Sequence, residues 1–354
     1  MESQACQAPR RARYAIVTAA MLFRDTFRPT CCSRVGTGAR IPSRPGFTRR
    51  GLARLAGSAA AAGFLPRGAS GATSKSLVVG SKSDTEGTLL GNVIATILEG
   101  LGFRVERRLG LGPTLIVRSA LIGGELDLYP EYTGNVAFFA GTETDPGWKD
   151  GETAYEMARR LDAAEGLSWL ARARADNTWC IAVNGALARS EGLATMTDFA
   201  RAVRADRIRL AASTEFVESP AALPAFEAAY DFHLPITRIV SLPGGDTAVT
   251  ARAAAEGISG INAGMVYGTD GAISALDLTV MSDPQRAQIV YEPAPVIRAR
   301  VLEAYPEIRA ALDPVFEALD AATLRRLNGA ITVEGRQAEA VAAAWLAERM
   351  SARR

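Results

Sequence analysis

The chain has 354 residues, among them 40 Lys and Arg, 38 Asp and Glu, one His and four Cys. The charge is unevenly distributed. Residues 1–72 hold 12 of the basic and 2 of the acidic residues and so carry about +10, which leaves about −8 on the remainder. An acidic body argues against a nucleic-acid-binding protein, which would need a basic surface.

The basic N-terminal segment has the pattern of an export signal. Arg49-Arg50 precedes a weakly apolar run over residues 55–65, and small residues follow at 70–72. This order is typical of a twin-arginine signal that is cleaved near residue 72, and an ordinary amphipathic helix is the alternative. The run is too short to remain as a membrane anchor. Residues before about Pro42 fit neither a signal nor a domain, which a start codon assigned too far upstream would explain.

After the leader, the sequence alternates between strand and helix patterns. The predicted elements are a strand at 77–80, a helix at 89–102, a strand at 104–107 and a helix at 113–122. Such alternation predicts a mainly parallel α/β sheet. Ligands then bind beyond the carboxyl ends of the strands, where residues 81–86 and 129–134 would lie.

The segment from Gly124 to Gly134 puts two tyrosines and three carboxylates on a short stretch that contains a proline. Pro130 would stop a helix or a central strand, so we expect a loop at the end of a strand to present the Tyr132 ring. Asp127 and Glu131 could each close on a bound cation or accept backbone N–H groups in the turn. The structural role is favoured for Asp127.

Further along, the sequence predicts a second set of elements. They are strands at 178–183, 208–211 and 238–240 and helices at 196–204, 219–230 and 247–257. From residue 306 to the end the periodicity is helical, with a composition suited to covering a sheet face.

Five blocks of the sequence, in order, resemble the periplasmic binding proteins for glycine betaine, choline and related osmoprotectants, which are soluble receptors of ABC importers. The blocks are residues 80–86, 109–114 with 120–121, 124–134, 267–271 and 291–298. The resemblance extends from about Leu77 to the C-terminus. It implies an α/β, two-lobed periplasmic-binding-protein fold, type II-like, with two hinge crossings that let the lobes close on a ligand.

The resemblance also implies the domain boundaries. The leader would occupy 1–72, the first part of lobe 1 would occupy 76–178, and lobe 2 would occupy 179–283. Residues 284–354 would return to lobe 1 and add the C-terminal helices.

Members of this family hold a trimethylammonium head in a box of aromatic side chains, and the matching positions here are Tyr132, Trp179, Tyr267 and Tyr291. A quaternary ammonium has no N–H to donate, so the negative faces of aromatic rings recognise it. The alternative is that these side chains pack in the core, with the hydroxyl or indole N–H of each hydrogen-bonded within the protein. The expected ligand-binding set also includes Thr133, beside Tyr132, and Asp270, which could instead cap the helix that follows it.

The sequence departs from the family at the position that grips the ligand carboxylate. Many betaine-binding members carry an Arg after a Glu-Phe pair, whereas here Glu215-Phe216 is followed by Ser219 at the Arg position. A hydroxyl is a weak substitute for a bidentate guanidinium. This departure favours choline or another cation without a carboxylate as the ligand. The chain looks closest to a stress-linked subgroup of the family that binds osmoprotectants with modest affinity.

Together these features predict the substrate-binding component of an ABC importer for quaternary-ammonium osmoprotectants such as glycine betaine or choline. We expect a monomer in the periplasm that meets permease subunits of the inner membrane and uses no cofactor, metal or nucleic acid. A receptor for another small cation or amino acid, or a ligand-sensing domain for a membrane signalling partner, is the alternative. An enzyme is not expected, because Cys180 and His233 are the only candidate nucleophile and base and Cys180 lies in an apolar strand.

Overall fold

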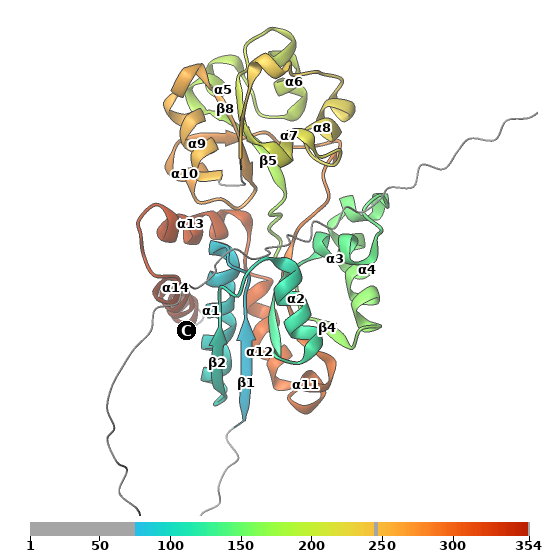
Figure 1. Ribbon diagram of the computed structural model, residues 1–354. Helices are drawn as coiled ribbons and strands as arrows, with labels where there is room; N and C mark the ends of the chain where they lie inside the picture. Colours follow the sequence, from blue (N-terminus) through green and yellow to red (C-terminus); the bar gives the residue numbers. More distant parts are fainter. Residues whose placement is uncertain (1–74, 244–246, 353–354) are drawn as a thin grey trace, which may run out of the picture. The chain divides into compact units, whose positions relative to one another are not determined.

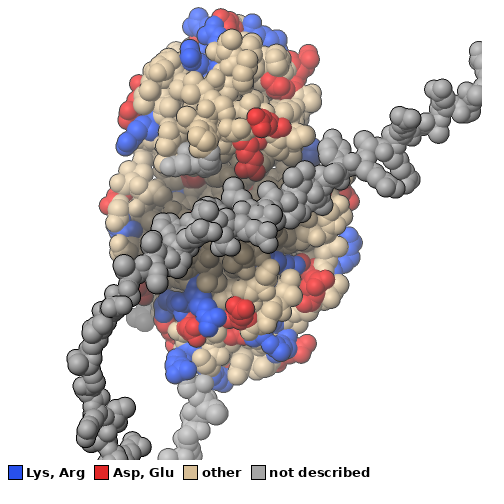
Figure 2. All heavy atoms as spheres, in the orientation of Figure 1, with Lys and Arg blue, Asp and Glu red and all other residues tan. Residues whose placement is uncertain are grey.

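The computed structural model describes residues 75–243 and 247–352. The expected leader, with Arg49-Arg50, lies outside the described residues. Within the described ranges no helix is both long and apolar enough to cross a membrane. The face shown in Figure 2 carries acidic and basic side chains interspersed over an otherwise uncharged surface.

The first of two five-stranded sheets has the strand order β2-β1-β3-β10-β4. Its strands are β1 (Ser76–Gly80), β2 (Arg104–Arg108), β3 (Leu128–Tyr132), β4 (Leu167–Trp169) and β10 (Pro293–Arg298). β1 runs parallel to β2 and β3, whereas β10 runs antiparallel to β3 and β4. We call this sheet, with the helices packed on it, the first lobe (Figure 1).

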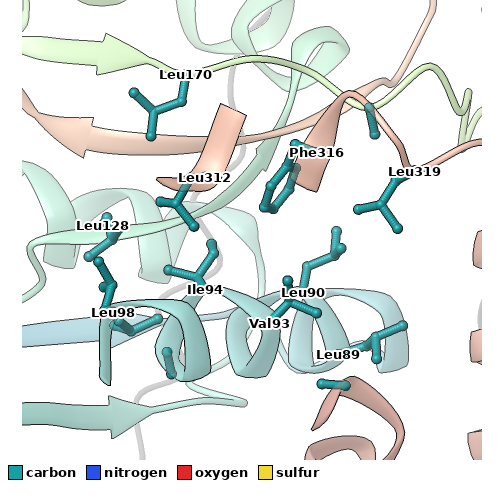
Figure 3. Packing of buried hydrophobic residues seen from close by; sticks show 14 of the residues in the cluster. Leu89, Leu90, Val93, Ile94, Leu98, Leu128, Leu170, Leu312, Phe316 and Leu319 are labelled. Atoms are coloured by element: carbon teal, nitrogen blue, oxygen red, sulfur yellow. The ribbon is translucent and has the colours of Figure 1, made fainter. Parts of the chain in front are cut away.

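The helices of the first lobe come from both ends of the described chain. They are α1 (Thr85–Gly100), α2 (Thr114–Gly123), α3 (Thr133–Ala140), α4 (Gly151–Ala163), α11 (Ala299–Ala304), α12 (Glu307–Phe316), α13 (Ala321–Thr332) and α14 (Ala338–Ala352). α1 packs against α12, α13 and α14. Their buried side chains form one core, in which Ile94 of α1 lies near Leu312 and Phe316 of α12 (Figure 3). A second core on the other face contains Trp148 and Trp169.

The second sheet has the strand order β7-β6-β8-β5-β9. Its strands are β5 (Trp179–Asn184), β6 (Leu210–Ser213), β7 (Ile239–Leu242), β8 (Ala263–Tyr267) and β9 (Leu278–Val280). The helices packed with them are α5 (Gly185–Glu191), α6 (Met196–Arg204), α7 (Thr214–Glu218), α8 (Leu223–Tyr230), α9 (Thr247–Glu256) and α10 (Ala272–Ala275). This second lobe has its own cores on its two sheet faces.

Both sheets are mainly parallel, as expected: in each, four strands run in one direction and one strand, β10 in the first sheet and β5 in the second, runs in the opposite direction. In the second sheet β6 is parallel to β7 and β8, but β5 is antiparallel to β8 and β9. The antiparallel strands β5 and β10 are the first strands after each crossing between the lobes. Each therefore enters its sheet from the edge that faces the other lobe, opposite to the strands of the strand–helix units.

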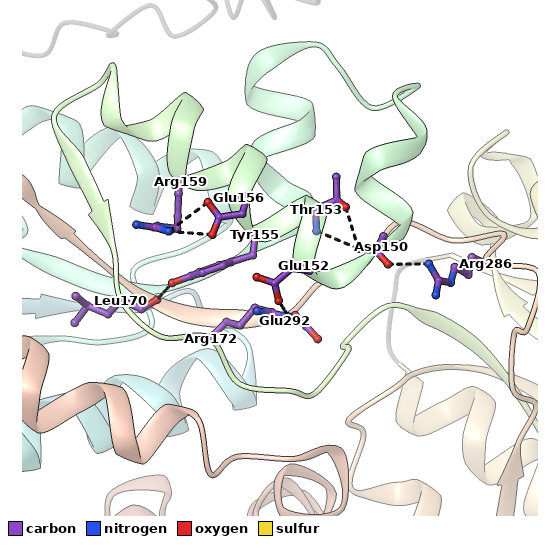
Figure 4. Close-up of polar contacts among 10 residues, drawn as sticks. All are labelled: Asp150, Glu152, Thr153, Tyr155, Glu156, Arg159, Leu170, Arg172, Arg286 and Glu292. Carbon is purple, nitrogen blue, oxygen red and sulfur yellow. Dashed lines mark hydrogen bonds and ion pairs between the residues drawn. The ribbon is translucent and has the colours of Figure 1, made fainter.

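Two crossing segments, residues 170–178 and 281–292, join the lobes and are hydrogen-bonded to each other. The backbone N–H of Asn177 donates to the carbonyl of Tyr291 at 3.0 Å, and the Thr178 hydroxyl donates to the carbonyl of Ile289 at 2.7 Å. Two ion pairs also hold the second crossing in place, as Figure 4 shows: Glu292 pairs with Arg172 of the first crossing, and Arg286 pairs with Asp150 of the first lobe, 2.7 Å apart.

Pro130 lies inside a central strand, so the prediction that it would exclude one is wrong. In β3 it pairs across the ladder with Pro295 of β10. On its other side β3 meets β1 only at the pair Val79 and Leu128, so no β1 partner needs the missing N–H at Pro130. Tyr132 is the last residue of β3, and its ring is presented from the carboxyl end of that strand.

Candidate functional site

A cleft of about 1490 Å³ is lined by residues of both lobes. This exceeds the roughly 300–1,000 Å³ of common small-molecule sites, as expected for a cleft that is open to a small ligand. Its lining includes all four expected aromatic residues and Asp270, together with Lys82, Asp84, Glu86, Asn135, Asn177, Glu215, Thr269 and Asn328.

The sheets bring the aromatic residues to one place from distant parts of the chain. Trp179 begins β5 and Tyr267 ends β8, and the two are direct cross-strand partners. Trp179 also packs edge-on against Phe216, with ring centroids 6.1 Å apart. Tyr291 lies on the second crossing, where its N–H donates to a carboxylate oxygen of Asp176 at 2.8 Å.

Gly134, at the start of α3, makes room for the Tyr291 ring. A Cβ atom at Gly134 would lie 2.7 Å from a ring carbon of Tyr291, closer than such contacts occur. The Tyr-Thr-Gly sequence after Glu131 therefore positions two aromatic rings of the cleft. Tyr132 supplies one ring, and Gly134 leaves space for the ring of Tyr291.

Thr133 and Ser219, which were expected in the ligand-binding set, are not among the lining residues. The buried Thr133 hydroxyl donates to the carbonyl of Val290 at 2.9 Å and accepts from the N–H of Glu292 at 3.1 Å, which ties α3 to the second crossing. Ser219 is the C-cap of α7, and its N–H donates to the carbonyl of Glu215.

Asp127 and Asp270, two acidic residues in or near the expected site, each accept a hydrogen bond from the backbone of the fold. Asp127 accepts from the N–H of Val78 at 2.8 Å and pairs with Arg298, which fits the structural role favoured for it. Asp270 lines the cleft and accepts from the N–H of Tyr267 at 2.8 Å, so it organises the turn after β8.

Lys82 is a lining residue that sequence reasoning did not single out, although it lies in the first of the five blocks. Lys82 comes shortly after the end of β1. Its ammonium nitrogen is 3.9 Å from the centroid of the Tyr132 ring. The same nitrogen is 3.3 Å from a carboxylate oxygen of Glu131. Lys82 thus places a positive charge on the face of one of the four aromatic rings.

Glu131 is fully buried and holds several of these groups in place. One carboxylate oxygen accepts from the N–H of Tyr132 at 2.8 Å and from the Asn135 amide at 2.6 Å, and the other accepts from the Tyr129 hydroxyl. These charge-assisted hydrogen bonds offset the cost of burying the carboxylate and fix the end of β3.

Glu86, in the first turn of α1, is the second buried carboxylate of the cleft. Its oxygens accept from the Tyr132 hydroxyl at 2.9 Å and from the Asn328 amide at 2.7 Å. Burial raises the pKa of Glu86 to about 7, although hydrogen bonds from Thr269, Asn328 and Tyr132 oppose the rise. Burial likewise raises the pKa of Asp176, whose carboxylate accepts from the Tyr291 N–H, to about 7.

Three tyrosines that line the cleft, and Cys180, stay protonated. Burial raises the pKa of the Tyr132, Tyr267 and Tyr291 hydroxyls and of the Cys180 thiol, so all four groups stay neutral. His233 is 79% exposed and lies beside Glu227. Among the described residues no cluster of His, Cys, Asp and Glu could hold a metal ion.

The sequence and the fold are similar to those of known transport proteins. The family model described as the substrate binding domain of ABC-type glycine betaine transport systems matches residues 75–348. The glycine betaine-binding protein YehZ of Escherichia coli is 50% identical over 273 residues, which are 77% of this chain and 90% of that protein. A glycine-betaine-binding protein of Pseudomonas aeruginosa is 31% identical, over 78% of this chain and 89% of its own length.

A solved structure of apo YehZ from E. coli, 49% identical, superposes with a TM-score of 0.71 and covers 77% of this chain and 98% of its own. The related proteins bind substrates for transporters and are not enzymes, which confirms that expectation. The chain belongs to the family of substrate-binding domains of ABC-type glycine betaine transport systems.

Proposed function

We propose that the cleft binds the quaternary ammonium group of an osmoprotectant in a cage formed by Tyr132, Trp179, Tyr267 and Tyr291. One observation carries the proposal: four aromatic side chains from both lobes and the second crossing line the same cleft. Each ring contributes about 0.5 to 2 kcal/mol to binding a desolvated cation. Because the phenols stay protonated, their ring faces offer this attraction to a cation without forming phenolate anions.

We further propose that the ligand is a zwitterion of the glycine betaine type. The Ser219 substitution alone would favour choline, but Ser219 does not line the cleft and Lys82 does. An ammonium beside the cage attracts a ligand carboxylate and repels a ligand that carries only positive charge. The names of the two relatives, both glycine betaine-binding proteins, support the same ligand class.

Lys82 also supports a modest affinity. Its ammonium already lies on the Tyr132 ring, so an incoming quaternary ammonium must share that ring face or displace Lys82 from it. Displacement would release Lys82 toward the ligand carboxylate but would lengthen its contact with Glu131. We expect a dissociation constant in the range of about 10 µM to millimolar.

In the cell, we propose that the leader directs export to the periplasm, where the monomeric protein delivers its ligand to permease subunits of an ABC importer. The support is the twin-arginine pattern at residues 49–50 and the transport family to which the chain belongs.

Isothermal titration of the purified protein with glycine betaine, choline, carnitine and proline betaine tests the ligand class. The carbon isostere of betaine, with a quaternary carbon in place of nitrogen, reports how much of the binding needs the cation. Tyr267→Ala should weaken betaine binding by about 1 to 2 kcal/mol, whereas Tyr305→Ala, outside the cleft lining, serves as the matched truncation. Equal affinity for betaine and its isostere would contradict the cage.

A further inference from the structure

The second lobe touches the first lobe at α13, away from the two crossings. The turn after β8, residues 268–271, lies on this helix. The Arg325 guanidinium donates to the carbonyl of Gly268 at 2.8 Å, and the Asn328 amide donates to the carbonyl of Thr269 at 2.9 Å. The helix α10, which follows the turn, also packs against α13.

Asn328 connects this contact to the aromatic residues. Its amide nitrogen donates both to the Thr269 carbonyl in the second lobe and to a carboxylate oxygen of Glu86, at 2.7 Å, in the first. The other Glu86 oxygen accepts from the Tyr132 hydroxyl. A continuous hydrogen-bonded path therefore runs from the Tyr132 ring through Glu86 and Asn328 to the turn that follows Tyr267. Thr269, Glu86 and Asn328 are all at least 95% buried.

We propose that Asn328 is a positioning residue that sets the spacing between the Tyr132 and Tyr267 rings across the cleft. The proposal rests on the proposed function, in which both rings contact the quaternary ammonium. Tyr132 belongs to the first lobe and Tyr267 to the second, and cation–π attraction requires the cation to lie within about 6 Å of each ring centroid. A contact that holds the β8 turn at a fixed place relative to Glu86 therefore affects affinity through the spacing of the two rings.

The chemistry of Asn suits this role because an amide nitrogen carries two N–H donors, and here each faces a different lobe. Asp has the same shape but no donor when ionised, so it would place a carboxylate against the Glu86 carboxylate and the Thr269 carbonyl oxygen. Asn328→Asp should therefore separate the lobes at this point while leaving the volume of the side chain unchanged.

The decisive experiment measures betaine affinity by titration for Asn328→Asp, for the double variant Glu86→Gln with Asn328→Asp, and for Arg326→Ala. We expect Asn328→Asp to weaken binding about tenfold or more. The double variant should recover part of this loss, because the new Gln amide can donate to the carboxylate introduced at position 328. Arg326→Ala changes the neighbouring residue, whose guanidinium pairs with Glu348 of α14 and not with the second lobe, so its affinity should stay within about twofold of wild type.

A pair of glycines at the same contact gives an independent test. A Cβ atom at Gly271 would lie 2.1 Å from the backbone nitrogen of Gly329, whereas a Cβ atom at Gly329 would meet nothing closer than 3.4 Å. Gly271→Ala should wedge the turn away from α13 and weaken betaine binding about tenfold, while Gly329→Ala should not. Equal affinities for wild type, Asn328→Asp and Gly271→Ala would overturn the proposal.

A measurement on the ligand-free protein separates this inference from the proposed function. Amide hydrogen exchange of residues 268–276 should be faster in Asn328→Asp and in Gly271→Ala than in wild type, and unchanged in Arg326→Ala. If wild type binds no betaine but exchange rises in the two variants, the contact stands and the ligand assignment fails. If wild type binds betaine and neither affinity nor exchange changes in the variants, Asn328 has no positioning role.

Discussion

Replacing Lys82 by Met should change which ligand the cleft prefers. Lys82 is one of only three lysines in the sequence, and its ammonium is shared between the Tyr132 ring and Glu131. Met keeps an unbranched apolar chain of similar length but removes the charge. A ligand with a carboxylate would lose its cationic partner, and the quaternary ammonium of either kind of ligand would lose a competitor for the ring face.

The expected magnitudes follow from these two contacts. Loss of a charge-assisted hydrogen bond to the betaine carboxylate costs about 1.5 to 3 kcal/mol. Vacating the Tyr132 ring offers about 0.5 to 2 kcal/mol to the quaternary ammonium of either ligand, so it does not change their ratio. The ratio of betaine affinity to choline affinity should therefore fall by the carboxylate contribution alone, about 10- to 150-fold.

The assay is a titration of each variant with both ligands at fixed ionic strength, with thermal unfolding measured in parallel. Lys75→Met is the matched control: Lys75 also stacks on a tyrosine, 4.9 Å from the Tyr305 ring centroid, and pairs with a glutamate, Glu307. It does not line the cleft, so its ligand ratio should be that of wild type.

Removal of Lys82 also leaves Glu131 buried without its cation, which lowers the free energy of unfolding. Lys82→Met with Glu131→Gln tests whether any change in ligand ratio comes from this loss of stability. If Lys82→Met leaves the betaine-to-choline ratio unchanged in a folded protein, the ligand carboxylate does not use Lys82 and the zwitterion preference must have another source.

Three further outcomes are expected. Gly134→Ala should weaken betaine binding about fivefold, because its Cβ atom would displace the Tyr291 ring, while Gly123→Ala, with nothing within 4 Å, should not; titration checks both. The folded-state pKa of Glu86 is about 7 against 4.5 ordinarily, so the folded state retains a proton that the unfolded state loses between pH 4.5 and 7. Stability should therefore fall as pH rises through that window, by about 3 kcal/mol, and Glu86→Gln should remove this part of the fall in urea unfolding at about pH 5 and 7.5. Changing Arg49-Arg50 to Lys-Lys should block export, and N-terminal sequencing of exported wild-type protein should begin near residue 72.

Local patterns predicted many elements well. The helix expected at 196–204 is α6, with the same bounds, because Thr195 caps it and its apolar residues recur at helical spacing. The helix expected at 219–230 begins only at Leu223. Ser219 ends the preceding short helix α7, and Pro220 follows directly after it.

The prediction for Pro130 was wrong because tertiary contacts decide whether a strand can contain a proline. A proline is excluded from a central strand only if its N–H would be needed, and that depends on how far the neighbouring strand extends. Here β1 pairs with β3 at Leu128 and no further, a register that the residues around Pro130 do not encode. The Pro-Ala-Pro stretch that opens β10 likewise forms a strand because it lies opposite β3.

The parts of the site that escaped prediction are those made by residues far apart in sequence. Lys82 follows a strand in a polar stretch and would ordinarily be solvated; only Glu131, 49 positions away, shows why it is buried. Asn328 lies in a helix whose periodicity indicates sheet cover, and its partner Glu86 is 242 positions away. Helix periodicity records which face is apolar, but it does not tell which buried polar side chain meets another lobe. The aromatic residues of the site could be identified by matching blocks of the sequence to the family. The charged and amide side chains that hold these rings in place could be identified only from the fold.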